Sequence, residues 1–148
     1  MRYLDKFQLL NKSELELFNR LKEATPALNV FVQVSMSQVF FMFPNRKDTF
    51  SKLGEIGRKS IDFLLCREDT SIVAAIELNG PKHEAPRQAE SDAKKRAALE
   101  EAGIPLMIYT PDNLPDVQTI RQTLAPLIVE RHVYEEKRRG EVQKKAPK

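Results

Sequence analysis

Two short apolar runs joined by a polar link constrain the fold more than any other feature of this sequence. Residues 61–66 and 72–78 are almost entirely apolar, and the link between them reads Arg-Glu-Asp-Thr-Ser. Runs of this length bounded by turn residues predict two β-strands joined as a hairpin. Because few positions on either strand are polar, we expect helices to cover both faces of the hairpin.

Two elements before the hairpin are indicated by their residue spacing. Apolar residues recur at helical spacing over residues 12–24, and Asn11 or Ser13 is placed to cap the first turn, so this stretch is predicted to be a helix. Residues 29–36 are rich in valine and are predicted to form a strand.

Three further elements follow the hairpin. Residues 85–102 are predicted to form a helix that Gly103 ends, and residues 104–110 a strand. Residues 116–139 are predicted to form a last helix, which Pro126 should kink or interrupt. Helices and strands in this order predict an α/β fold, with a four-stranded mixed sheet flanked by helices.

The positive charge is concentrated at the C-terminal end. The 148 residues suffice for one compact domain, and the formal net charge is +3. Residues 131–148 hold seven lysines and arginines against three acids, a balance of +4. We therefore divide the chain into a domain over residues 1–130 and a basic tail over residues 131–148. The tail can bind a phosphate backbone, or it can be a solvated helix end that keeps the protein soluble.

The composition excludes several classes of protein. No apolar run approaches the roughly 18–20 residues that span a bilayer, and no secretory signal follows the first methionine. The single cysteine, Cys66, excludes an intramolecular disulfide and a cysteine-based zinc cluster. We expect no membrane partner and a reducing compartment, by default the cytoplasm.

A long connection precedes the hairpin. Residues 44–60 hold five basic residues against two acids, and a connection of this length is often functional. It follows a bulky apolar cluster that is either core or a surface for a partner. Phe40 to Phe43 is thus a candidate contact for a protein partner or for a second copy of the chain.

Two carboxylates are expected to meet at one end of the hairpin. If the loop is centred on the polar link, Asp62 lies opposite Glu77, with Cβ atoms about 5 Å apart on one face, and Asn79 shares that face. Two opposed carboxylates are destabilising unless a cation compensates them, and oxygen ligands of this kind suit Mg²⁺ or Mn²⁺. The alternative is that one acid lies at the rim of the sheet and pairs with Lys59 or Lys82.

A histidine follows the second strand closely. His83 comes six residues after Glu77, close enough to reach the same end of the sheet. It is a candidate for acid–base work or for phosphate contact, although a single histidine is more often structural.

The order and spacing of these residues resemble the restriction-endonuclease-like domain, the PD-(D/E)XK superfamily. The similarity is to the branch near very-short-patch repair endonucleases and to a bacterial family of uncharacterised nuclease-like domains. It runs from about residue 9 to residue 108. The matching segments are residues 60–66, residues 75–80 with His83, then Asp92, Arg96 and Leu99, and finally residues 102–106.

The resemblance implies a four-stranded mixed sheet with its site at the end of the central hairpin, and Mg²⁺-dependent hydrolysis of a phosphodiester. Asp62 and Glu77 match the metal-ligand positions. Glu14 matches an acid of the first helix that adds a ligand or orients a water. Gln33 matches a polar residue of the first strand that points into the site, and His83 matches the histidine after the glycine turn.

One position departs from the superfamily. The lysine expected two residues after the glutamate is Asn79 here, which brings no positive charge. Lys59 could supply that charge from the neighbouring strand, and Lys82 is a weaker candidate. The narrower family usually has Asp or Asn at this position, so the change alone does not imply inactivity.

The expected function is therefore that of a metal-dependent DNA endonuclease. Basic residues on the connection, on the predicted helix over residues 85–102 (Lys95 among them), just before that helix and on the tail would bind phosphates without reading sequence. The other candidates are Lys47, Lys52, Arg58, Lys82, Lys94, Arg138 and Arg139. The alternative is a catalytically inactive accessory protein on a nuclease fold, binding DNA and protein in plasmid transfer, defence or repair. An ordinary solvated helix face also explains the charges of residues 86–101.

Overall fold

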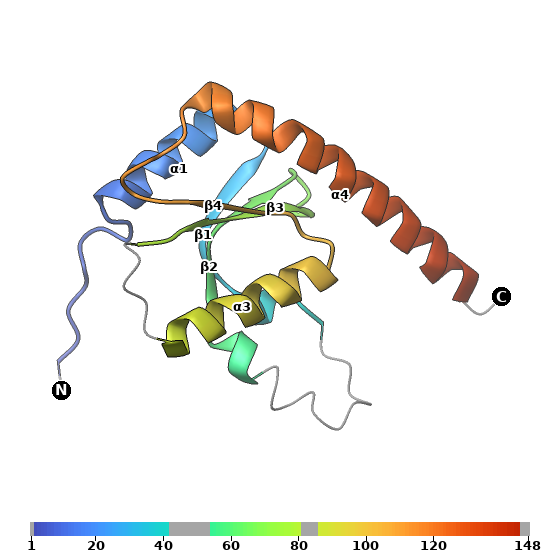
Figure 1. Cartoon of the computed structure of the whole chain (residues 1–148), viewed down its shortest axis with the longest axis horizontal. Helices are drawn as coiled ribbons and strands as arrows, with labels where there is room; N and C mark the ends of the chain where they lie inside the picture. Colours follow the sequence, from blue (N-terminus) through green and yellow to red (C-terminus); the bar gives the residue numbers. More distant parts are fainter. Residues whose placement is uncertain (1, 42–53, 81–85, 146–148) are drawn as a thin grey trace.

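A computed structural model describes residues 2–41, 54–80 and 86–145 (Figure 1). Residues 54–57 form a helical turn within the long connection. The main elements, in chain order, are α1 (Lys12–Ala24), β1 (Asn29–Ser35), the short 3₁₀ helix η1 (Met36–Gln38), β2 (Ser60–Cys66), β3 (Ile72–Leu78), α3 (Pro86–Glu101), β4 (Leu106–Tyr109) and α4 (Val117–Lys145).

The four strands form one mixed sheet in the order β1-β2-β3-β4. The first three strands are antiparallel to their neighbours, whereas β3 and β4 are parallel. This arrangement confirms the predicted α/β fold with a four-stranded mixed sheet flanked by helices. β4 is parallel to β3 because α3 carries the chain back across the sheet between them.

Helices cover both faces of the sheet, as its apolar strands require. Figure 1 shows α1 and α4 on one side and α3 on the other. Phe63 and Leu65 of β2 pack in the core that includes α1 and α4, whereas Leu64 and Cys66 pack in the core that includes Leu99 of α3. Successive side chains of β2 therefore enter different cores, which is why almost every position of this strand is apolar.

The hairpin register differs from the predicted one at its loop end. Phe63 lies opposite Ile76 as predicted, but Cys66 lies opposite Ile72 rather than Val73 because the register shifts after Leu65. The loop closes through Thr70, whose φ is 69°. A non-glycine residue in this left-handed conformation is typical of a hairpin with a bulge at its loop. The shift leaves the other end of the hairpin, where the two acids lie, in the expected register.

Helix α4 is longer than predicted. It runs without interruption from Val117 to Lys145 and contains Pro126, so the proline does not end the helix. Pro126 is exposed, and a proline ring facing solvent can be accommodated by local adjustment of the backbone. None of the described helices is long and apolar enough to cross a bilayer.

A buried arginine attaches α4 to the far end of the hairpin. Arg131 is 6% exposed, and its guanidinium donates to the carbonyl oxygens of Ile72, Ala102 and Gly103, each at 3.0 Å. One turn later, Glu135 accepts two hydrogen bonds from the guanidinium of the hairpin-loop arginine, at 2.8 and 3.1 Å. Arg131 and Glu135, at the start of the predicted tail, therefore contact the hairpin, while His132 and Val133 between them are exposed.

Candidate functional site

Asp62 and Glu77 lie together at the end of the β2–β3 hairpin. The paired residues Phe63 and Ile76 are their neighbours on the ladder, and the two carboxyl groups line the same polar cavity. Asp62 Oδ2 also accepts a hydrogen bond of 2.8 Å from the backbone N–H of Leu78. The structure thus brings the two carboxylates together, as the hairpin predicts.

Glu77 is the buried member of this pair. Its side chain is only 8% exposed, and its Oε1 atom has no hydrogen-bond partner among the described residues. Burial, together with the neighbouring carboxyl group of Asp62, raises the pKa of Glu77 to about 8, against an opposing effect of Lys95. At neutral pH this pair of carboxyl groups therefore retains a proton.

The cation beside the pair comes from helix α3. Lys95 Nζ lies 2.5 Å from Glu77 Oε1, and the lysine side chain is 14% exposed. The two groups are close enough for an ion pair, although their angles are not those of a hydrogen bond. Of the two lysines that the sequence offers as partners for an acid, Lys59 hydrogen-bonds Ser91 Oγ through its Nζ, and Lys82 lies outside the described residues.

The sequence analysis named Lys95 only as a contact to backbone phosphates and did not place it beside Glu77, although its spacing indicates that position. Lys95 lies four residues after Ser91 and four before Leu99, which is fully buried. Residues four apart share one face of a helix. A lysine on the sheet-facing side of α3 is therefore directed toward the end of the hairpin.

These groups line a polar cavity of about 400 Å³. Asp62, Glu77, Asn79, Lys59 and Arg58 from the sequence analysis all contribute to its wall. The other lining residues are Ser60, Leu78, Gly80, Ser91, Asp92 and Lys95. Three acids and three bases thus face one small cavity, and a third carboxylate, Asp92, faces it from α3.

Glu14 and Gln33 form a separate network beside this cavity. Gln33 Nε2 donates to Glu14 Oε2 at 3.2 Å, and Gln33 Oε1 accepts from Ser60 Oγ at 3.3 Å. Glu14 Oε1 also accepts from the backbone of Asn11, completing a capping box at the start of α1. Neither Glu14 nor Gln33 lines the cavity; Ser60 connects them to it.

The predicted phosphate-binding residues that the structure describes do not all lie on one surface. Lys94 is on the exposed side of α3 and pairs with Glu55 at 2.9 Å. Arg138 and Arg139 lie on α4, beyond the contact that joins this helix to the hairpin loop, at the end of the hairpin opposite to the cavity. Four further candidates, Lys47, Lys52, Lys82 and His83, lie outside the described residues.

The aromatic cluster that was a candidate partner surface is divided. Phe40 packs against the core on the α3 side of the sheet. Phe41 is 78% exposed, while Met42 and Phe43 lie outside the described residues.

The donor set of the cavity suits a small divalent cation. No three His, Cys, Asp or Glu side chains among the described residues form a metal-binding group. Mg²⁺, however, commonly uses one or two carboxylates and keeps several waters. Two neighbouring carboxyl groups that retain a proton at neutral pH can exchange it for such an ion, and Asn79, which lines the same cavity, has an amide oxygen. The residues present therefore fit Mg²⁺ or Mn²⁺.

Comparison with known proteins identifies the family. Residues 6–127 match the family described as a protein of unknown function (DUF2726), and the chain belongs to this family. The matched region contains α1, all four strands, α3 and the cavity.

A curated relative is also similar over much of the chain. It is an uncharacterized protein of Haemophilus influenzae, 32% identical over 108 residues, which are 70% of this chain and 54% of the relative. The chain thus spans about half the length of that relative. No solved structure matches this chain.

Proposed function

We propose that this protein is a metal-dependent endonuclease that hydrolyses DNA phosphodiesters, and that its domain is restriction-endonuclease-like. The observation that carries the proposal is that Asp62 and Glu77, with Lys95 beside Glu77, line one polar cavity at the end of the central hairpin. A mixed sheet with carboxylates at this end of the hairpin is the arrangement that the sequence resemblance implies.

In this proposal, Asp62 and Glu77 hold Mg²⁺ or Mn²⁺, with Asn79 as a third oxygen donor. When bound, the ion would activate water and stabilise charge on the phosphate. Asp62 is oriented for this role by the N–H of Leu78. Glu77 must give up its proton before it can act as a ligand, so ion binding releases a proton.

Lys95 supplies the positive charge that the superfamily's lysine, replaced here by Asn79, would provide. Its ammonium group lies against Glu77 and therefore beside the position of a phosphate bound at the two carboxylates. A fixed positive charge there stabilises the negative charge that develops in the transition state. Arg58 and Lys59, which line the same cavity, would bind the adjoining phosphates. His83 stays a candidate for proton transfer to the leaving group.

The basic residues of the tail would bind the DNA backbone away from the cavity. Asp62 and Arg67 are five residues apart on β2 and its loop, or about 17 Å at 3.3 Å per residue. Since α4 is attached at Arg67, Arg138 and Arg139 cannot bind the same phosphate as the cavity. They would bind the backbone about five or more base pairs away, taking 3.4 Å per base pair.

The second candidate function is binding of DNA and a protein partner without hydrolysis. Asn79 in place of lysine favours it. For either function, the cytoplasm is the proposed location, because the one cysteine is a buried thiol and the chain cannot form an intramolecular disulfide.

Cleavage of plasmid and linear DNA by the full chain, in Mg²⁺, Mn²⁺ or EDTA, tests the proposal. Asp62→Asn and Lys95→Met should each lower the rate at saturating DNA by about 100-fold or more, the usual effect of removing one transition-state contact. Lys94→Met is the matched control: it removes the neighbouring exposed lysine and should change DNA affinity rather than the saturated rate.

Calorimetric titration with Mn²⁺ separates the two candidates. Binding that Asp62→Asn abolishes, together with cleavage, supports the endonuclease. Retained Mn²⁺ and DNA binding without cleavage supports the accessory protein. Cleavage that survives both Asp62→Asn and Glu77→Gln would refute the assignment of the site.

A further inference from the structure

Strand β1 forms an open edge of the sheet. Among the described strands it pairs with β2 alone, so the backbone groups along its other side are free to pair. Natural edge strands are usually protected by charged residues or proline. Here residues 27–45 contain no Asp, Glu, Lys or Arg, in a chain that is 30% charged, and β1 itself contains no proline. The one irregularity of β1 is Gln33, with a φ of 51°.

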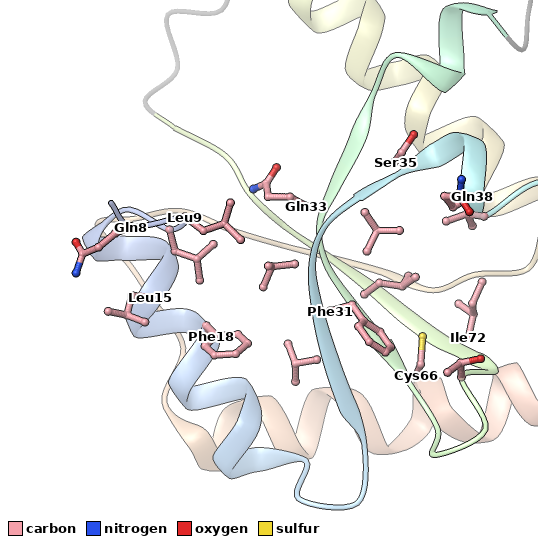
Figure 2. A pocket seen from close by; sticks show the side chains of 17 residues that line it. Gln8, Leu9, Leu15, Phe18, Phe31, Gln33, Ser35, Gln38, Cys66 and Ile72 are labelled. Carbon is pink, nitrogen blue, oxygen red and sulfur yellow. The ribbon is translucent and has the colours of Figure 1, made fainter. Parts of the chain in front are cut away.

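An apolar groove of about 1020 Å³ follows this edge. Figure 2 shows lining side chains on both sides of β1. Leu15 and Phe18 of α1 lie on one side, and Phe31, Cys66 and Ile72 lie on the other. None of the residues that line the groove is charged. Both faces of the sheet therefore present apolar side chains next to the same free edge.

The shape of this surface suits an extended strand. A strand laid along β1 would complete its backbone hydrogen bonds and direct alternate side chains toward the two walls of the groove. Such an occupant must be apolar on both faces and uncharged, because an unpaired charge would lose its hydration against this lining.

We propose that the occupant is β1 of a second copy of the chain, paired antiparallel across a twofold axis. The sequence Asn-Val-Phe-Val-Gln-Val-Ser of β1 is uncharged and has apolar side chains on both faces: three valines on one, and Phe31 among uncharged polar residues on the other. A twofold axis satisfies both edges at once and closes the assembly. Phe31 of β1 is 41% exposed and would be covered in this pairing. Leu9 and Leu15, which are 69% and 42% exposed, extend the contact beyond the strands.

Sedimentation velocity of the full chain between about 10 and 200 µM tests the dimer. Twice the 17.0 kDa mass is expected at the higher concentrations. Phe31→Lys should weaken association at least tenfold. Phe41→Lys, at a more exposed phenylalanine that does not line the groove, should leave association unchanged. Circular dichroism of both variants checks that the fold is retained.

Disulfide cross-linking locates the axis. Single cysteines placed at Val30, Phe31 or Val32 should give a covalent dimer on mild oxidation, most strongly at the position nearest the axis. A cysteine at Val133, which is 62% exposed on α4, should not. A monomer at every concentration, a dimer that Phe31→Lys leaves intact, or equal cross-linking at Val133 would each overturn the proposal. Since none of these variants alters the polar cavity, the result is independent of nuclease activity.

Discussion

The buried acid Glu77 makes the stability of this protein depend on pH in a defined direction. Its pKa is raised from an ordinary 4.5 to about 8 in the folded state, so the folded protein binds this proton more tightly than the unfolded chain. The resulting stabilisation is complete below pH 4.5 and is lost as the pH rises through 8. A shift of this size corresponds to an upper limit on the order of 5 kcal/mol, at about 1.4 kcal/mol per pH unit.

The substitution Glu77→Gln isolates this effect. Glutamine has nearly the shape of the protonated acid and stays neutral at every pH. At pH 6 in EDTA we expect the variant to be more stable than the original protein by about 2 kcal/mol, because the unfolded glutamate has already lost its proton there while the folded one keeps it. At pH 9 the variant should be more stable by several kcal/mol, because it has no buried charge to form. Urea denaturation at the two pH values measures the difference.

A control substitution at an exposed glutamate and the addition of Mn²⁺ complete the test of Glu77. Glu23→Gln, at an exposed glutamate of α1, should show no such dependence on pH. Mn²⁺ at pH 9 should stabilise the original protein and leave Glu77→Gln nearly unchanged, because binding to the folded state alone raises its stability. A difference in stability between Glu77→Gln and the original protein that is the same at pH 6 and pH 9 would refute the assignment of a buried, protonated Glu77.

Two further predictions concern the attachment of α4. Gly103 has a φ of 66°, and an added Cβ would lie 2.6 Å from the ring of Tyr134. Gly103→Ala should therefore cost about 2 kcal/mol or more of stability, whereas Gly140→Ala, with open space around it in α4, should add up to about 1 kcal/mol. Arg131→Ala should cost about 3 kcal/mol, since it leaves three carbonyl oxygens without their donor, and the exposed Arg138→Ala should stay within about 0.5 kcal/mol. Urea denaturation measures all four, and equal effects within either pair would contradict the packing described for α4.

The strands and helices follow from interactions that are local in the sequence. Asn11 caps α1 because its side chain accepts from the N–H three residues later, and this spacing can be read directly. Asp62 and Glu77 are fifteen residues apart, but a hairpin with a short loop brings them together, so their proximity is also predictable. The bulge after Leu65 was not, because it depends on the left-handed conformation that Thr70 adopts in the loop.

The sequence by itself therefore determined the α/β class and the meeting of two carboxylates at one end of a hairpin. Only the tertiary structure decided that Lys95 rather than Lys59 lies against Glu77, that Arg131 of α4 is buried, and that β1 is an edge strand among the described strands. The physical reason is that these features depend on how α3, α4 and β1 pack on the sheet. That packing is set by apolar surfaces from distant parts of the chain, whose pairing no local spacing of residues specifies.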